Sequence, residues 1–492
     1  MEMIQEWTTE LRYRPYDKWP KAYVDELTKQ VDASIWRFHY HIQPVTGLLN
    51  DPNGFSYFNG QWHIFYQAYP FGPVHGLKSW YHLYSDNLID WKRDGIRLEA
   101  DSIYDSHGVY SGSALPVGDQ LFLAFTGNVR NAQWDRHAYQ LGAYMESDFT
   151  VKKIDTPLIP DPPQGYTHHF RDPQVIFYED TYYLIIGAQT DDEKGQVLCY
   201  QSDDRINWNL LGALTFTDQE MGYMIECPNL LFVDGQAVLI FCPQGIDKTI
   251  FDYQNIYPNT YITAEKFDPK TATLTTPSTL SHIDEGFDVY ATQGFQAPDG
   301  RALTIGWMGL PELHYPTDQE NWAHGLTLVR ELHFQDGHLY QRPASETALL
   351  RQEALPVTVK QLQDGLTAEN NSYELQLTLP EGERGELVIA ANSDHTKGLV
   401  IAFDTTRGMI SVDRGQMTHV PSPEYGTTRS YQARTKTLHL QLFVDSSMFE
   451  LFINHGEAVL SGRMFPTKQQ RTLALTGSAE NVAFWPLRSM NE

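Results

Sequence analysis

Five strand–turn–strand units recur along this chain at intervals close to 60 residues. Anchored at Asp51, Gly112, Asp172, Glu226 and Gln293, the units begin 61, 60, 54 and 67 residues apart. Each unit has two short apolar runs separated by a turn rich in Gly, Asn or Asp, which is typical of a β-hairpin. A β unit repeated five times at this period predicts a five-bladed β-propeller.

Three of the five units place a carboxylate beside a proline where the first strand opens. The pairs are Asp51-Pro52, Asp172-Pro173, and Glu226 two residues before Pro228. The innermost strands of a propeller line its central channel, so equivalent positions in different units meet around the axis. Asp51, Asp172 and Glu226 are therefore expected to share one pocket. Convergent carboxylates of this kind are what hydrolysis of a sugar bond requires.

A second motif supports the repeat, and a change of pattern divides the chain. The string Ser-Asp-x-x-Ile-x-Trp occurs at 85–91 and again at 202–208. Apolar residues at helical spacing precede the repeat, and strictly alternating short strands follow it. The predicted fold is all-β, with four parts: a helical N-terminal segment at 1–35, the five-bladed β-propeller at 36–342, a linker with a short helix at 343–355, and a β-sandwich at 356–492.

Composition excludes several classes of partner. The chain of 492 residues has 36 basic and 62 acidic side chains, a formal net charge of −26, which disfavours nucleic acid and anionic membranes. No apolar stretch is long enough to span a bilayer, and the N-terminus lacks the basic-then-apolar start of a secretory signal. Three cysteines without a Cys-x-x-Cys pair argue against disulfides or a zinc site. We expect a cytoplasmic protein acting on a small molecule, with a homodimer as a compatible assembly.

An ordered set of short motifs resembles glycoside hydrolase family 32, the β-fructofuranosidases, over nearly the whole chain. The motifs are Asn-Asp-Pro-Asn-Gly at 50–54, Phe-Tyr-Gln at 65–67, Tyr-Ser-Gly-Ser at 110–113, Phe-Arg-Asp-Pro at 170–173, Glu-Cys-Pro at 226–228 and Trp-Met-Gly at 307–309. Strings at 444–447 and 454–459 fit the second domain of the family. Strings at 40–44, 75–80 and 104–108 most resemble the bacterial members that act on sucrose 6-phosphate.

The resemblance implies a division of labour among the acids. Asp51 would be the nucleophile, Asp172 would stabilise the transition state and Glu226 would be the general acid and then base. A salt bridge with Arg171 is the structural alternative for Asp172. Retention would follow, with Asp51 and Glu226 about 5–5.5 Å apart. Glu226 is expected among apolar groups and near another carboxylate, so that it stays protonated near neutral pH.

The resemblance also implies contacts with the sugar. The expected contacts are Leu48, Leu49, Asn50, Gln67, Trp80, Tyr110, Ser111, Arg171, Tyr290 and Trp307. Many relatives have Trp-Met where this chain has Leu48 and Leu49, Trp-Gly-His where it has Trp-Tyr-His at 80–82, and Trp at the position of His75.

A phosphate on the leaving group would need cations beside the acids. Arginine is the better bidentate partner for phosphate, and lysine acts as a point charge. The candidates, expected in loops after the inner strands, are His75, Lys78, Arg130, Arg136 and His137. Histidines also cluster near the acids in sequence, at 39 and 41 and at 168 and 169, and could suggest a metal. The mechanism needs no cation, so we predict no metal and no cofactor.

The leading hypothesis is a retaining glycosidase that hydrolyses the β-D-fructofuranoside bond of sucrose 6-phosphate, sucrose, or both. The products from the phosphorylated substrate would be glucose 6-phosphate and fructose. A fructan hydrolase or fructosyltransferase is the alternative within enzymes, because the rim that separates these activities is not visible in the sequence. An inactive sugar-binding propeller is the alternative of another class. The intact trio of acids argues against this last alternative.

Overall fold

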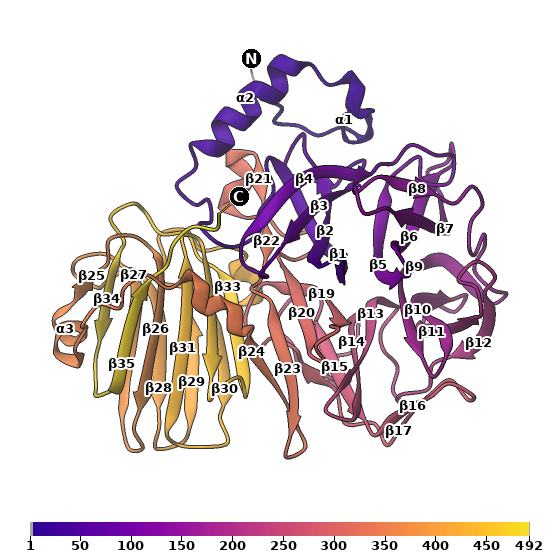
Figure 1. The fold of residues 1–492 in the computed structure, drawn as a ribbon. Helices are drawn as coiled ribbons and strands as arrows, with labels where there is room; N and C mark the ends of the chain where they lie inside the picture. Colours follow the sequence, from indigo (N-terminus) through magenta and orange to yellow (C-terminus); the bar gives the residue numbers. More distant parts are fainter. Residues whose placement is uncertain (1–2, 492) are drawn as a thin grey trace.

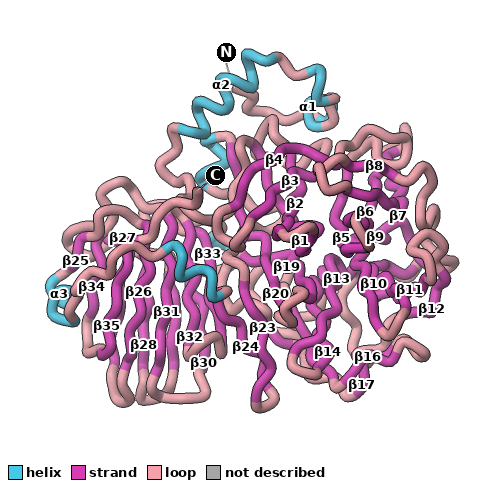
Figure 2. The backbone as a smooth tube through the Cα atoms, viewed as in Figure 1, coloured by secondary structure: helices cyan, strands magenta, loops and turns pink. Residues whose placement is uncertain are grey.

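The structure, a computed structural model, describes residues 3–491 and consists mainly of β-strands (Figures 1 and 2). The predicted all-β class is confirmed. The helix expected in the N-terminal segment is α2 (Lys21–Asp32), which buries Tyr23, Leu27 and Val31. The expected linker helix is a 3-10 turn at Ser345–Leu350. The other helical pieces are α1 (Thr9–Arg12), α3 (Val359–Asp364) and 3-10 turns at Tyr16–Lys18, Pro316–Glu320 and Pro423–Tyr425. Among residues 3–491, no helix is long and apolar enough to cross a membrane.

Within the described range, five sheets of four or five strands follow one another between residues 47 and 343. The first has β1 (Gly47–Phe58), β2 (Gln61–Tyr69), β3 (Ser79–Ser85), β4 (Trp91–Leu98) and β21 (Trp322–Ala323), and the second has β5 (Val109–Val117), β6 (Gln120–Arg130), β7 (Arg136–Met145) and β8 (Val151–Lys153). The third has β9 (Tyr166–Tyr178), β10 (Thr181–Thr190), β11 (Gly195–Ser202) and β12 (Asn209–Ala213). The fourth has β13 (Met224–Val233), β14 (Gln236–Gln244), β15 (Thr260–Ala264) and β18 (Ser281–His282). The fifth has β19 (Val289–Gln296), β20 (Ala302–Met308), β22 (Gly325–Leu326), β23 (Arg330–Gln335) and β24 (His338–Pro343). A separate ribbon pairs β16 (Lys266–Asp268) with β17 (Thr273–Thr275).

The five sheets are arranged in a ring. Each predicted hairpin is present, and its first strand is β1, β5, β9, β13 or β19. Each first strand contacts the next, and β19 contacts β1, so the first strands surround a common axis (Figure 1). The short strand β21 pairs in parallel with β1, which adds a late segment of the chain to the first sheet. Residues that open equivalent strands are therefore brought together.

A β-bulge interrupts each of these five first strands at an equivalent point. The unpaired residues are 50–51, 110–111, 172–173, 227–228 and 291–292. A bulge bends the strand and redirects its side chains, and bulges are over-represented beside active sites. Asp172, Cys227 and Ala291 have positive φ angles of 69°, 49° and 47°, which are unfavourable for residues other than glycine. This strain is concentrated where the acids enter the ring.

The motif found at 85–91 and 202–208 forms the same turn in the first and third sheets. The side chain of Asn87 accepts two backbone N–H groups, and that of Asp204 does the same in the other copy. The indole N–H groups of Trp91 and Trp208 each donate to the carbonyl three residues earlier, at 3.0 and 2.9 Å. The repeat seen in the sequence is thus a repeat of side-chain hydrogen bonding as well as of hydrophobicity.

Two further sheets lie beside the ring (Figure 1). One orders β25 (Leu366–Thr367), β34 (Thr472–Leu475), β27 (Arg384–Ala391), β28 (Leu399–Asp404), β29 (Met409–Asp413) and β30 (Thr428–Gln432). The other orders β33 (Ala458–Arg463), β32 (Met448–Ile453), β31 (Leu438–Asp445), β26 (Ser372–Leu379) and β35 (Glu480–Pro486). Inward-facing residues of both sheets, such as Leu377, Ile401 and Leu440, form one apolar core. The alternation noted in the sequence therefore separates core from surface.

Buried charges join the ring to these two sheets. His41 precedes the first sheet, and its two ring nitrogens lie 2.9 Å from Asp445 and 3.0 Å from Glu450. Arg330 of β23 pairs with Glu450 at 2.7 Å and with Asp284 at 2.9 Å. Burial lowers the pKa of His41, but its hydrogen bonds to the two carboxylates outweigh this and raise the pKa to about 9. The imidazole is therefore a buried cation at neutral pH.

We expect His41→Ala to destabilise the protein by about 3 kcal/mol, because the substitution leaves two buried carboxylates with one cationic partner fewer. A raised pKa stabilises the folded state below the unfolded value near 6.5, and this stabilisation is lost as the pH rises through about 9. Melting temperatures measured from pH 6.5 to 9.5 should fall with pH more steeply in the wild type than in the variant. His439→Ala, at an exposed position of the same strand as Asp445, is the control. Equal melting curves for wild type and His41→Ala would contradict the prediction.

Candidate active site

The openings of the first strands and the N-terminal segment surround a cavity of about 660 Å³. Asp51, Asp172 and Glu226 all line this cavity, so the convergence expected from the repeat is observed. The thiol of Cys227 lies between two of them, with its Sγ 3.7 Å from Asp51 Oδ2 and 3.6 Å from Asp172 Oδ2. The bulges of β1, β9 and β13 thus bring three carboxyl groups to the same end of the ring.

Asp51 is held by neutral donors. The Asn50 amide donates to Oδ1 at 3.0 Å, and the Gln67 amide donates to Oδ2 at 3.3 Å. The hydroxyl of Ser111, from the bulge of β5, also donates to Oδ2. The carboxylate is therefore oriented by side chains from three strands of two sheets. Such an arrangement fixes the oxygen atoms of Asp51 without neutralising the carboxylate by an ion pair.

Asp172 is the acid of the trio most removed from water. Its Oδ2 accepts the backbone N–H of Cys227 at 3.0 Å, and Arg171 Nε is 4.0 Å away. Burial raises the pKa of Asp172 to about 7; Arg171 opposes this rise, and the charges of Glu226 and Asp51 add to it. The cluster of carboxyl groups therefore retains a proton up to near-neutral pH.

Glu226 does not lie among apolar groups, and that expectation is wrong. Its Oε1 accepts two hydrogen bonds from Arg171, at 2.7 and 3.1 Å, and its Oε2 accepts the hydroxyl of Tyr290 at 2.7 Å. Burial raises the pKa of Glu226, but Arg171 and Tyr290 outweigh burial and lower it. Of these two acids, Asp172 rather than Glu226 is accordingly the one that keeps a proton near neutral pH. The residues adjacent to Glu226 in sequence are non-ionic, but the long side chain of Arg171 comes from the neighbouring sheet.

Cations line the same cavity as the acids. Lys78 is buried, and burial lowers its pKa to about 8 while the three acids oppose this change. Arg136 and Arg171 both donate to Nδ1 of His169, at 3.3 and 3.1 Å. Burial and these two arginines lower the pKa of His169 to about 4, so its ring is neutral. The cavity therefore contains a local cluster of positive charge, although the chain as a whole is negatively charged.

The N-terminal segment adds Arg12 and Tyr13 to the cavity. The Arg12 carbonyl accepts the N–H of Leu77 at 2.7 Å, and the Arg12 Nε donates to the Trp7 carbonyl at 3.2 Å. The hydroxyl of Tyr16 donates to the Leu77 carbonyl at 2.7 Å. These bonds attach the segment to the loop that carries His75 and Lys78, so two distant parts of the chain form one side of the cavity.

Most of the predicted contact residues line the cavity. They are Leu48, Asn50, Gln67, His75, Lys78, Tyr110, Arg136, Arg171, Tyr290 and Trp307. Sequence reasoning missed Arg12, Tyr13, His169, Tyr223, Gln244, Tyr257 and His324, which also line it. Gln244 had a signal, because a glutamine ends the second strand of three of the hairpins, and His169 had one in its place next to the Arg-Asp-Pro motif. Nothing in the sequence indicated that the helical N-terminal segment would reach the acids.

Five predicted contacts do not line the cavity. Leu49 packs in the core because it alternates with Leu48 along β1, and Trp80 is fully buried, with its indole N–H donating to the Tyr110 carbonyl at 3.0 Å. Ser111 lies beneath the acids, bonded to Asp51. Arg130 turns to Trp134, whose carbonyl it contacts at 3.0 Å, and His137 turns to Asp161 at 3.3 Å. Because Arg130 and His137 do not line the cavity, their assignment as phosphate contacts is withdrawn.

Two family models and several known proteins are similar to this chain. Residues 41–343 match the glycosyl hydrolases family 32 N-terminal domain, and residues 344–487 match the family 32 C-terminal domain. A sucrose-6-phosphate hydrolase of Pediococcus pentosaceus is 48% identical over 97% of this chain and 95% of its own, and one of Streptococcus mutans is 43% identical over 97% and 98%. The structure of a sucrose-6-phosphate hydrolase from Lactobacillus gasseri is similar with a TM-score of 0.93 and 42% identity, covering 99% of this chain and 100% of that one. A Bombyx mori β-fructofuranosidase is similar with a TM-score of 0.81 and 29% identity, covering 96% and 97%.

Proposed function

Because this chain belongs to glycoside hydrolase family 32, we propose that it hydrolyses the β-D-fructofuranoside bond of sucrose 6-phosphate to glucose 6-phosphate and fructose. The observation that carries the proposal is the cavity that three carboxyl groups line together with lysine and arginine side chains. The relatives with this name in Pediococcus pentosaceus and Streptococcus mutans support the choice of substrate. A sugar-binding protein without activity would have no need of three acids placed at or beside bulges of the first strands.

The proposed architecture assigns the chemistry to one part of the chain. Residues 36–342 would form a five-bladed β-propeller, supported by the ring of first strands. Residues 1–35 would be a helical segment, 343–355 a linker, and 356–492 a β-sandwich, supported by the common core of its two sheets. We place the enzyme in the cytoplasm, which fits a phosphorylated substrate and the three free, buried cysteines.

The proposed reaction is a double displacement at the anomeric carbon of the fructosyl unit. Asp51 attacks this carbon while Glu226 gives its proton to the departing glycosidic oxygen, and glucose 6-phosphate leaves. Glu226, now ionised, then takes a proton from a water molecule that displaces Asp51 from the fructosyl ester. Asp172 accepts hydrogen bonds from fructosyl hydroxyls as positive charge develops on the ring. Fructose leaves with retained configuration.

For catalysis, substrate binding must transfer the proton of Asp172 to Glu226. In the free site the proton favours Asp172, since Arg171 and Tyr290 stabilise ionised Glu226. Hydroxyl groups of the fructosyl unit that donate to Asp172 would stabilise its charged form. The proton would then pass to Glu226, which is the acid next to the glycosidic oxygen in this proposal. The correct sugar would therefore activate the acid that cleaves it.

The phosphate would bind on the side of the cavity formed by the N-terminal segment and the openings of the first two sheets. Arg12, Lys78 and Arg136 are the cations there that line the cavity. His75 lies beside them, and burial and the charge of Lys78 lower its pKa, so it would contribute as a neutral donor. Arginines suit a phosphate because they offer paired N–H groups in one plane.

We expect Arg12→Ala to raise KM for sucrose 6-phosphate by about tenfold and to leave KM for sucrose unchanged. One charge-assisted hydrogen bond to phosphate is worth about 1.5–3 kcal/mol, and a tenfold change corresponds to about 1.4 kcal/mol. Initial rates with the two substrates measure the effect. Arg14→Ala is the matched control, because Arg14 stacks on Trp19 at 4.9 Å and does not line the cavity. Equal losses on both substrates would remove Arg12 from the phosphate site.

The experiment that tests the function compares kcat/KM for sucrose 6-phosphate, sucrose and an inulin-type fructan on the purified chain. We expect sucrose 6-phosphate to be preferred over sucrose by at least about tenfold. Equal values for these two would contradict the phosphate site, and a preference for the fructan would favour a fructan hydrolase. Hydrolysis also requires that glucose 6-phosphate and fructose form in equal amounts. A deficit of free fructose would indicate transfer to another sugar.

A further inference from the structure

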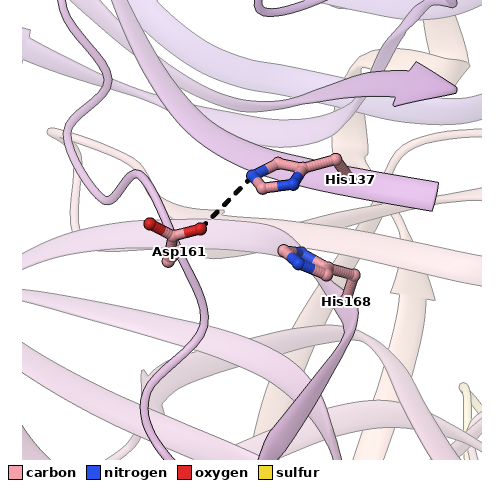
Figure 3. Close-up of side chains that lie close together, drawn as sticks. All are labelled: His137, Asp161 and His168. Atoms are coloured by element: carbon pink, nitrogen blue, oxygen red, sulfur yellow. Dashed lines mark ion pairs between the residues drawn. The ribbon is translucent and has the colours of Figure 1, made fainter. Parts of the chain in front are cut away.

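We propose that His137, Asp161 and His168 form a binding site for a divalent transition-metal ion beside the cavity. One ligand atom from each of the three side chains lies within 4.8 Å of the others. Figure 3 shows the two imidazole rings and the carboxylate facing a common point. His137 Nε2 lies 3.3 Å from an oxygen of Asp161, and the centroids of the two imidazole rings are 4.0 Å apart. This site is separate from the acids that the proposed hydrolysis uses.

The backbone fixes all three positions. His137 belongs to β7 and His168 to β9, and Asp161 lies on the segment between β8 and β9. That segment is bound to β7 just before Asp161, where the N–H groups of Leu158 and Ile159 donate to the Gln140 carbonyl at 2.8 and 3.2 Å. The segment that carries Asp161 is thus attached to β7. The two histidines belong to strands, which position ligands more precisely than loops do.

His168 has a nitrogen atom that lacks a partner. Its Nδ1 is buried and accepts or donates no hydrogen bond among the residues that the structure describes. A buried polar atom without a partner costs free energy, and a bound ion would remove that cost.

The donor set determines the class of ion. Two imidazole nitrogens and one carboxylate oxygen suit Zn²⁺, Co²⁺, Ni²⁺ or Cu²⁺, whereas Mg²⁺ and Ca²⁺ prefer oxygen atoms alone. Three protein ligands leave at least one coordination position for water. Since Asp161 is largely exposed, an ion can reach the site from solvent.

The site would act on the cavity through neighbours in sequence. His137 follows Arg136, and His168 precedes His169, and both of these neighbours line the cavity. Arg136 and Arg171 share Nδ1 of His169, and Arg171 holds Glu226. A metal ion would therefore fix the separation of the two strand ends that carry this chain of contacts.

Binding of Zn²⁺ to the purified full-length chain, measured by calorimetry and by equilibrium dialysis at pH 7.5, tests the site. We expect one equivalent to bind in the wild type, and an affinity at least about tenfold weaker in both His168→Ala and Asp161→Asn. His333→Ala, which removes a histidine 3.0 Å from Glu331 elsewhere, should bind like the wild type. Asp161→Asn alters an exposed side chain, so it keeps the test valid if His168→Ala does not fold. Absence of stoichiometric binding in the wild type, or unchanged binding in a folded variant of the site, would overturn the proposal.

Discussion

Asp51→Asn is expected to lower kcat on sucrose 6-phosphate by at least about 10⁴-fold, because the proposed covalent intermediate forms on this carboxylate. Asparagine has nearly the same shape, and its one side-chain oxygen can still accept the hydroxyl of Ser111. Its amide nitrogen replaces the oxygen that accepts from Asn50, so one neutral hydrogen bond is lost and the fold and KM should change little. The loss in kcat would therefore measure the effect on the chemical step and not on folding or substrate binding. Release of glucose 6-phosphate under single-turnover conditions measures the step in which Asp51 acts.

A matched control separates this effect from a change in charge. Asp119→Asn removes the same negative charge at an exposed turn of the second sheet, where it should leave kcat unchanged. The circular dichroism spectrum and the melting temperature of Asp51→Asn should match those of the wild type. A loss in kcat of less than about tenfold would show that another group attacks the sugar.

Glu226→Gln should lower kcat by about 10³-fold and remove the alkaline limb of the pH profile. Because the pKa of Asp172 is raised to about 7, the cluster holds a proton below that pH and loses it above. In the wild type, kcat/KM should thus fall as the pH rises through about 7. Glutamine has no acidic proton to donate, so kcat/KM of the variant should not fall as the pH rises through about 7. Measurements of kcat/KM from pH 5 to 9 test this prediction.

The leaving group provides an independent check on Glu226. A fructosyl donor whose leaving group departs without protonation, such as a fructosyl fluoride, should restore the first step in Glu226→Gln. Glu265→Gln, at an exposed position, should retain the wild-type profile. An unchanged alkaline limb in Glu226→Gln would mean that the observed proton belongs to another group.

The sequence was informative where the repeat dictates geometry. Equivalent positions in five hairpins predicted that Asp51, Asp172 and Glu226 meet, because first strands in a ring share an axis. The bulges beneath the three acids were not predicted. A bulge is a local change of register, and it leaves the alternation of apolar residues on either side intact. Its effect, turning carboxylates into the cavity, is visible only when both strands are placed.

The environment of Glu226 shows a second limit of sequence reasoning. Its sequence neighbours predicted apolar surroundings, whereas Arg171 and Tyr290 come from strands 55 and 64 residues away. The same limit applies to Arg12, which lines the cavity because the Leu77 N–H holds its carbonyl and the Trp7 carbonyl accepts from its side chain. Contacts between side chains from distant strands set the charge state of the acids, and no periodic pattern records them.

The anomeric configuration of a transfer product tests the central claim most directly. With methanol as the acceptor, attack on a fructosyl ester of Asp51 should give methyl β-D-fructofuranoside, because two displacements retain the configuration of the substrate. The product can be identified by NMR, since a methyl fructoside does not interconvert with its other anomer in neutral solution. Formation of methyl α-D-fructofuranoside would show a single displacement and would contradict the roles proposed for Asp51 and Glu226.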